Sequence, residues 1–146
     1  MKKEEFIEEY NTFLAETGLK AKEVIVSSGG ACLMMGAREE TDDLDVDVPE
    51  SFYMMVKSIF PEKVNSSSMG EYIDYNSIVS IHNTLSDRAV EIDGVWCYTV
   101  EEMIKQKKRL IKMPDRASGK AERDKNDLKG LMEFKRKNKS KTFKKD

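Results

Sequence analysis

Residues 24–31 read Val24-Ile25-Val26-Ser27-Ser28-Gly29-Gly30-Ala31, and residues 41–46 read Thr41-Asp42-Asp43-Leu44-Asp45-Val46. The β-branched run 24–26 predicts a short buried strand, and the paired glycines predict a turn that leads into a helix over 31–35. Strict alternation over 44–48 predicts a second strand with one polar face. A strand, a glycine turn, a helix and an acidic strand therefore form the unit on which we base the fold.

The chemistry of this unit favours a phosphate and a metal ion. Gly29 and Gly30 carry no Cβ at the start of a helix, so a phosphate group can approach the backbone N–H groups. Asp43 and Asp45 share one face of a strand, because side chains two residues apart point the same way. Adjacent carboxylates repel each other unless a cation lies between them, and their oxygens suit Mg²⁺ or Mn²⁺. Each motif alone is common, and an acidic strand face is more often simply solvated.

The rest of the chain predicts further helices and strands around this unit. Amphipathic helices are predicted over residues 3–16, 52–60, 99–113 and from a break at Ser118-Gly119 to residue 134. Further strands are predicted over residues 78–82, 89–92 and 95–98, and a loop over residues 62–70. This order indicates an α+β (α/β) fold, in which a small mixed sheet is packed by helices.

The length of 146 residues fits one domain. We expect that domain over residues 1–134, with the sheet in 1–98, C-terminal helices in 99–134 and a basic flexible tail in 135–146. No apolar run approaches 18 residues, which predicts no membrane span, and a cytoplasmic location is the expectation. The two cysteines lack the spacing of a disulfide scaffold or a zinc site.

Charge is divided unevenly along the chain. Residues 1–100 carry 8 Lys/Arg and 19 Asp/Glu, a net charge of −11, whereas residues 101–146 carry 17 Lys/Arg and 8 Asp/Glu, a net charge of +9. This division favours a cation site in the first part and an anionic partner for the second. The alternative is that the two parts neutralise each other where they meet.

The motifs resemble the signature of the nucleotidyltransferase fold, "GG…G-x-R…T-x-D-h-D-h", in which h is hydrophobic. The matching segments are residues 29–31, 36–38 and 41–46. The pattern is similar to that of minimal bacterial members, such as lincosamide-type antibiotic nucleotidyltransferases and abortive-infection toxins. Residues 99–107 and 123–128 also resemble the family's "s-x-E-E-h-h-x-x-K" and "K-D-x-x-D-h" segments.

The resemblance implies an Mg²⁺-dependent enzyme that transfers a nucleoside monophosphate from an NTP to a hydroxyl group of a small molecule or an RNA. It implies metal binding by Asp43 and Asp45, and nucleotide binding by Ser28, Gly29, Gly30, Arg38 and Thr41. Arg38 either contacts phosphate or pairs with a neighbouring acid, for which the candidates are Glu39, Glu40 and Asp42. The resemblance is also compatible with a homodimer in which a second subunit completes a shallow cleft.

One departure from the family pattern concerns a third carboxylate, expected within an "h-D-h-H" segment. The corresponding segment, residues 79–82, has Ser80 in place of the acid and ends with His82, a candidate base or phosphate ligand. Candidate replacements for the acid are, in order of preference, Asp74, Glu91 and Asp93.

Two other functions follow if this acid is not replaced. One is hydrolysis of a nucleotide phosphate, with an NTP or an NMP as substrate. The other is a non-catalytic module that binds nucleic acid or protein through a basic cluster, for which the candidates are Lys107, Lys108, Arg109, Lys112, Arg116 and the tail.

Overall fold

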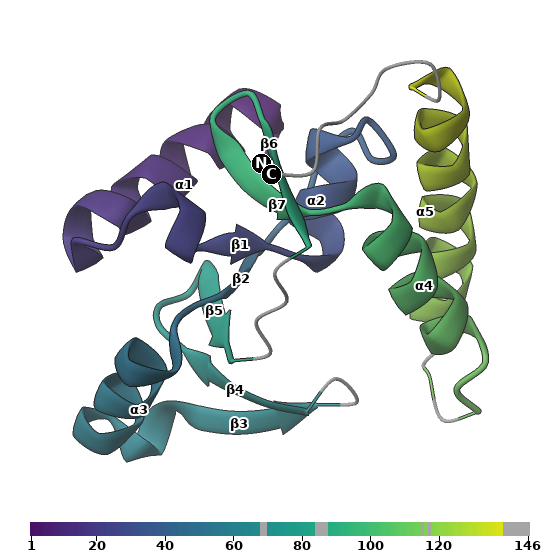
Figure 1. The fold of residues 1–146 in the computed structure, drawn as a ribbon. Helices are drawn as coiled ribbons and strands as arrows, with labels where there is room; N and C mark the ends of the chain where they lie inside the picture. The colour runs from purple at the N-terminus through teal and green to yellow at the C-terminus, as the bar shows by residue number, and fades with distance from the viewer. Residues whose placement is uncertain (68–69, 84–87, 115, 117, 139–146) are drawn as a thin grey trace.

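Strand β1 (Ile25–Val26) lies inside a seven-stranded sheet with the order β3-β4-β5-β2-β1-β7-β6 (Figure 1). The computed structural model describes residues 1–67, 70–83, 88–114, 116 and 118–138. The other strands are β2 (Leu44–Asp47), β3 (Val64–Ser67), β4 (Gly70–Asp74), β5 (Val79–His82), β6 (Ala89–Ile92) and β7 (Val95–Tyr98). Because β1 is antiparallel to β2 and parallel to β7, the sheet is mixed, which confirms the predicted fold class.

Five α-helices surround the sheet. They are α1 (Lys3–Thr17), α2 (Ser28–Met34), α3 (Glu50–Ile59), α4 (Val100–Ile111) and α5 (Ser118–Lys137), and short 3₁₀ turns cover Ala21–Glu23 and Pro61–Lys63. Figure 1 shows α4 and α5 side by side at one end of the molecule, with α3 beside β3 at the other. In the described part of the chain, no helix combines the length and hydrophobicity needed to cross a bilayer.

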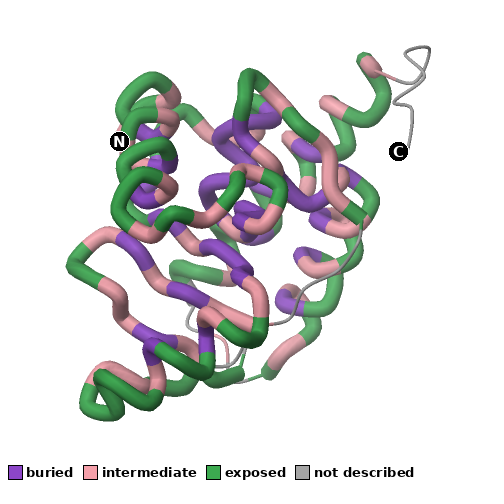
Figure 2. The backbone as a smooth tube through the Cα atoms, turned by 60° about the vertical axis from the view of Figure 1, so that its left-hand side comes forward, coloured by how far each residue is buried: buried purple, intermediate pink, exposed green. Residues whose placement is uncertain are grey.

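Most of the hydrophobic core lies on one face of the sheet, and the opposite face is polar along β2, β4 and β5. Leu44 and Val46 of β2 are fully buried, and α1 contributes large aromatic side chains to the same core, namely Phe6, Tyr10 and Phe13. Figure 2 shows this burial along the central strands and the inner sides of the helices. Since side chains alternate along a strand, Asp45 of β2 points away from Leu44 and Val46 and is partly exposed.

A β-hairpin replaces the loop that the sequence predicts over residues 62–70. The 3₁₀ turn Pro61–Lys63 leads into β3, and β4 begins at Gly70. Val64 of β3 pairs with Ile73 of β4. The prediction fails because β3 is an edge strand whose polar residues, Asn65, Ser66 and Ser67, have low strand propensity. Pairing with β4, rather than local preference, holds this segment extended.

Helix α5 is longer at both ends than the sequence predicts. It begins at Ser118, so the expected break at Ser118-Gly119 is wrong, and it continues to Lys137, so the first residues of the predicted tail are helical. Basic residues in its last turn favour the helix, since they lie near the negative end of the helix dipole. Residues 139–146, the remainder of the predicted tail, lie outside the described residues.

Gly130 allows α5 to approach the loop after α2 closely. A Cβ at position 130 would lie 2.7 Å from the Cα of Ala37 and 2.7 Å from its Cβ. In an isolated helix, replacing glycine with alanine is favourable by about 1 kcal/mol. Here we expect Gly130→Ala to lower the free energy of unfolding by about 1–3 kcal/mol, because a backbone atom cannot move aside cheaply. Urea denaturation followed by circular dichroism measures this change.

Gly119→Ala is the matched control, because it lies on the same helix and, among the described residues outside its own helical turn, no atom lies within 4 Å of the added Cβ. We expect this variant to be neutral or slightly more stable than the natural chain. If Gly130→Ala were stabilising to the same degree, α5 would not be packed against Ala37.

Candidate active site

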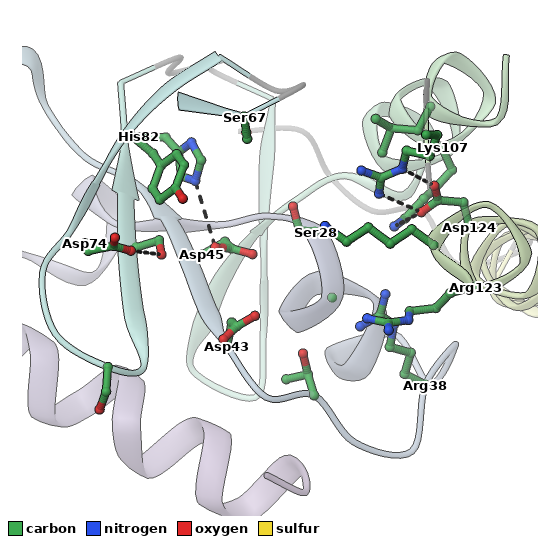
Figure 3. Close-up of a pocket in the computed structure, with 18 of the residues that line it drawn as sticks. Ser28, Arg38, Asp43, Asp45, Ser67, Asp74, His82, Lys107, Arg123 and Asp124 are labelled. Carbon is green, nitrogen blue, oxygen red and sulfur yellow. Dashed lines mark hydrogen bonds and ion pairs between the residues drawn. The ribbon is translucent and has the colours of Figure 1, made fainter. Parts of the chain in front are cut away.

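A cavity of about 390 Å³ lies between the polar face of the sheet and the α4–α5 pair (Figure 3). Eight of the nine residues that the sequence predicts for the site line it, namely Ser28, Gly29, Arg38, Thr41, Asp43, Asp45, Asp74 and His82. Figure 3 shows Asp43, Asp45 and Asp74 on the sheet side, and Arg38, Arg123 and Lys107 on the helix side together with Asp124. The fold therefore brings together residues from five separate segments of the chain.

Asp43 and Asp45 form the acidic wall of the cavity. Asp45 belongs to β2, and Asp43 is the residue before that strand. In the described part of the chain, no Lys or Arg lies within ion-pair distance of Asp43, and Asp45 has only His82 nearby, at 3.9 Å. Burial raises the pKa of Asp43, and the charges of Asp45 and Asp42 raise it further. The wall therefore carries negative charge that the protein compensates poorly.

Asp74 provides a third carboxylate beside the position where the family pattern expects one. On the shared face of the sheet, Ser80 of β5 is paired with Asp45 of β2 on one side and with Asp74 of β4 on the other. Strand spacing therefore places Asp74 roughly 10 Å from Asp45, one strand farther than an acid at position 80. The amide of Asn65 donates a hydrogen bond to Asp74 at 2.6 Å, and the hydroxyl of Ser80 is 3.5 Å away.

The other two candidates for the third acid lie elsewhere. Glu91 and Asp93 belong to the β6–β7 hairpin, at the far end of the strand order from β4. Asp93 pairs instead with Lys3 at 2.6 Å, and neither acid lines the cavity. Of the three candidates, Asp74 alone lines the cavity, and its role as the third acid stays a prediction.

His82 lies at the end of β5, on the same wall as the carboxylates. Its Nε2 is 3.9 Å from an oxygen of Asp45, and its ring stacks on Tyr72, with the centroids 5.7 Å apart and the planes 27° apart. Tyr72 also lines the cavity, which the sequence did not predict. The stacking restricts the orientation of the imidazole, so that one nitrogen faces Asp45.

The two glycines of the motif have different surroundings. A Cβ at Gly29 would lie 2.4 Å from Nη1 of Arg38 and 2.7 Å from Oγ1 of Thr41, so this glycine makes room for cavity side chains. A Cβ at Gly30 would instead lie 2.3 Å from Cζ of Phe6, in the core. Gly30 is absent from the cavity lining. From the sequence, both glycines are predicted to make room for a phosphate. In the structure, Gly30 instead makes room for the Phe6 side chain of α1.

Ser28 marks the point where strand β1 turns into helix α2. The helix begins at Ser28 and includes both glycines, so it starts earlier than the predicted 31–35. Ser28 has a φ of 55°, which a side chain with a Cβ rarely adopts. Such strain occurs often at ligand-binding positions, and Ser28 does line the cavity.

Arg38 forms a bidentate ion pair with Asp127, which is none of the three acids predicted as its partner. Its Nε donates to Oδ1 of Asp127 at 2.8 Å and its Nη2 donates to Oδ2 at 2.7 Å. The sequence offered Glu39, Glu40 and Asp42 as partners, but local acids on the same loop are not paired with Arg38. The partner comes from α5, because the close packing at Gly130 brings that helix to the loop.

Asp124 and Asp127 anchor a buried charge network between the C-terminal helices. Lys107 lies 3.0 Å from each of the two carboxylates and is only 3% exposed, and Nε of Arg116 donates to Asp124 at 2.9 Å. Lys107 and Arg116 thus form internal ion pairs, rather than a basic surface for nucleic acid as the sequence allowed. With Arg38, three cations share two carboxylates, so the network carries net positive charge beside the cavity.

Two further cations line the cavity from α5. Lys120 and Arg123 are exposed, and in the described part of the chain neither has an ion-pair partner. They are not among the site residues predicted from the sequence, although their spacing of three positions predicts a shared helix face. Their location indicates a second contact region for an anionic ligand.

The charge network predicts that stability falls in acid. Burial raises the pKa of Asp124 and Asp127, but hydrogen bonds and ion pairs with Arg116, Lys107 and Arg38 outweigh burial and lower both values overall. A lowered pKa stabilises the fold above the unfolded-state pKa, and this contribution is lost as pH falls through the folded-state value. We therefore expect the urea midpoint to decrease below about pH 4.

A comparison with Asp127→Asn isolates the contribution of the Asp127 carboxyl group to this pH dependence of stability. The variant cannot bind the proton in question, so its stability should depend less steeply on pH, by up to about 1.4 kcal/mol per pH unit. Identical slopes for the two proteins between pH 5 and 3 would contradict the network's role in acid stability.

Two solved structures are similar to this fold. The polyadenylate synthase of Megavirus superposes with a TM-score of 0.58 at 15% identity, over 90% of this chain and 31% of that chain. The antibiotic-resistance factor ANT(2'')-Ia superposes with a TM-score of 0.52 at 14% identity, over 92% of this chain and 90% of that chain. The chain thus spans less than a third of the synthase.

No protein-family model and no curated protein matches the sequence. The likeness to the two solved structures nevertheless shows that the chain has the nucleotidyltransferase fold, in agreement with the motif resemblance. At these identities the likeness concerns the fold alone.

Proposed function

We propose that this protein is a nucleotidyltransferase, which transfers a nucleoside monophosphate from an NTP to a hydroxyl group of an acceptor. The observation that carries the proposal is the division of one cavity into two walls. Poorly compensated carboxylates, Asp43 and Asp45, form one wall, and cations including Arg38 and Arg123 form the other. A nucleoside triphosphate bound with its metal ion carries both charges that such a cavity would attract. The metal ion would be attracted to the acidic wall, and the phosphates to the cationic wall.

The phosphates of the nucleotide would bind toward the second wall. Ser28 and Gly29 lie in the first turn of α2, where backbone N–H groups have no helical acceptor. Arg38 adds a fixed guanidinium nitrogen beside Gly29. Thr41 supplies a hydroxyl group next to the same glycine.

The residues of the acidic wall fit a divalent cation of the Mg²⁺ type. Asp43 and Asp45 offer oxygen ligands, and burial, followed by repulsion from Asp45, raises the pKa of Asp43. No group of three His, Cys, Asp or Glu side chains that could hold a metal occurs among the described residues. Two carboxylates suffice for Mg²⁺, because substrate phosphates and water usually complete its coordination. When bound, the ion would supply charge neutralisation at the phosphate oxygens.

The acceptor hydroxyl must lose its proton as its oxygen attacks the α-phosphorus and the bond to pyrophosphate breaks. His82 is the candidate to receive that proton at Nε2, since Tyr72 and Asp45 fix its ring within the cavity. Asp74 is the second candidate, although Asn65 already occupies one of its oxygens. A base within hydrogen-bond reach of the acceptor contributes about 10²–10⁴-fold to such a rate.

The names of the two similar structures agree with nucleotide transfer but point to different acceptors. One is a polyadenylate synthase and the other is an aminoglycoside nucleotidyltransferase. We extend to this chain only the transfer itself, with a small molecule or an RNA as the class of acceptor.

The phosphate species that is released, pyrophosphate or orthophosphate, distinguishes transfer from hydrolysis. The full chain is incubated with Mg²⁺, each of the four NTPs in turn, and a mixture of small hydroxyl compounds and RNA. We expect pyrophosphate and a product that carries label from the α-phosphate. Orthophosphate without a labelled adduct would overturn the proposal in favour of a phosphohydrolase. The absence of either product, with all acceptors tested, would favour a non-catalytic module.

A further inference from the structure

Asp127 holds Arg38 from outside the cavity. The two residues are separated by 89 positions, and the carboxylate engages Nε and Nη2 of the guanidinium at 2.8 and 2.7 Å. The side chain of Asp127 is only 2% exposed. A bidentate pair of this kind fixes the plane of the guanidinium as well as its position.

The third guanidinium nitrogen of Arg38 is directed to the cavity. Nη1 takes no part in the bidentate pair, and it lies 2.4 Å from the point that a Cβ at Gly29 would occupy. Any larger residue at position 29 would therefore displace it. Because Gly29 and Arg38 both line the cavity, the N–H groups of Nη1 are placed for an anion there.

The carboxylate of Asp127 is itself held in place. Nζ of Lys107 lies 3.0 Å from Oδ2 of Asp127 and 3.0 Å from Oδ1 of Asp124. Asp127 does not line this cavity, whereas Arg38 does. Any effect of Asp127 on a ligand in the cavity is therefore exerted through the two lining cations that it holds, Arg38 and Lys107. Arg38 is the one whose plane Asp127 fixes, because only Arg38 is held through two nitrogens.

We propose that Asp127 is a positioning residue, which orients Arg38 so that Nη1 binds the polyphosphate of the substrate. The proposal rests on the proposed function and makes it more specific, because it assigns a role to α5 in substrate binding. Gly29 belongs to the same arrangement, since its missing side chain provides the space for Nη1. Disturbing any of the three residues should thus weaken the same phosphate contact.

Binding of inorganic tripolyphosphate to the full chain, measured by isothermal titration calorimetry, tests the proposal without turnover. We expect Asp127→Asn and Arg38→Lys each to weaken binding about tenfold or more, since a charge-assisted hydrogen bond is lost or misplaced. The double variant should bind no more weakly than Arg38→Lys alone. Such non-additivity reports coupling between the two side chains, which a general structural role for Asp127 would not produce. Additive losses would overturn the proposal.

Two further variants keep the test valid if Asp127→Asn folds poorly. Gly29→Ala leaves the ion pair between Arg38 and Asp127 chemically intact but removes the space for Nη1, so it should weaken tripolyphosphate binding to a similar extent. Leu131→Ala is the control for loosening of α5, because Leu131 is fully buried on the same helix but does not line the cavity. If Leu131→Ala weakened binding as much as Asp127→Asn, loosening of α5 would explain both and the proposal would fail.

The two proposals fail in different ways. If the natural chain binds tripolyphosphate with this coupling but forms no nucleotidyl product, the proposed function fails and the role of Asp127 stands. If the natural chain forms the product but the coupling is absent, the role of Asp127 fails and the proposed function stands.

Discussion

Replacing Asp45 with asparagine should lower the rate of nucleotidyl transfer by at least about 10²–10³-fold. Asp45 lies between Asp43 on its own strand segment and Ser80 on β5, and its carboxylate faces the cavity. Asparagine has the same shape, but it removes half of the paired negative charge that fits a divalent cation. The measurement is incorporation of α-labelled nucleotide into the acceptor, with thermal unfolding as a check on the fold.

Asp93→Asn is the control for this result, because it removes the same charge from a distant hairpin. Asp93 has a φ of 49° in its turn and pairs with Lys3 at the surface. Asparagine tolerates this backbone conformation well, so the turn should persist. We expect unchanged transfer in this variant. Full activity in Asp45→Asn would refute the assignment of the acidic wall to metal binding.

Replacing Asp124 with asparagine should produce the largest loss of stability, about 3 kcal/mol or more. The carboxylate is 1% exposed and holds both Lys107 and Arg116. Its loss leaves the buried ammonium of Lys107 with one counter-ion instead of two, and an uncompensated buried charge is costly. Guanidinium or urea denaturation at pH 7 gives the change in the free energy of unfolding.

Glu133→Gln on the same helix serves as the comparison. Glu133 is exposed, and its ion pairs with Arg136 and Lys137 are screened by solvent. This variant should unfold at nearly the same denaturant concentration as the natural chain. A loss for Asp124→Asn below about 1 kcal/mol would show that the network contributes as little as a surface pair.

The acidic strand and the glycine turn were predictable because their signals are local. Alternation in residues 44–48 depends only on the two-residue period of a strand, and the shared direction of Asp43 and Asp45 follows from it. The shift to a helix after β1 likewise follows from the glycines and the neighbouring apolar residues. Both elements are present in the structure, with small differences in where they begin and end.

The hairpin of β3 and β4 was not predictable in the same way. Residues 65–67 are polar and exposed, and only their pairing with β4 keeps them extended. That hairpin also supports Asp74, which stands beside Ser80 and restores a third carboxylate to the cavity. Ser80 stands where the family pattern has an acid. Whether another carboxylate lies near that position depends on the order of the strands, which a local sequence pattern does not determine.

The sequence by itself determined the unit of strand, glycine turn, helix and acidic strand, and with it the wall formed by Asp43 and Asp45. Only the tertiary structure decided the other wall, in which Arg38 is held by Asp127. It also decided that Gly30 packs against Phe6 in the core and does not line the cavity. The physical reason is the range of the interactions. Periodicity and turn preference act within a few residues, whereas ion pairs and close packing join segments that meet only after the chain has folded.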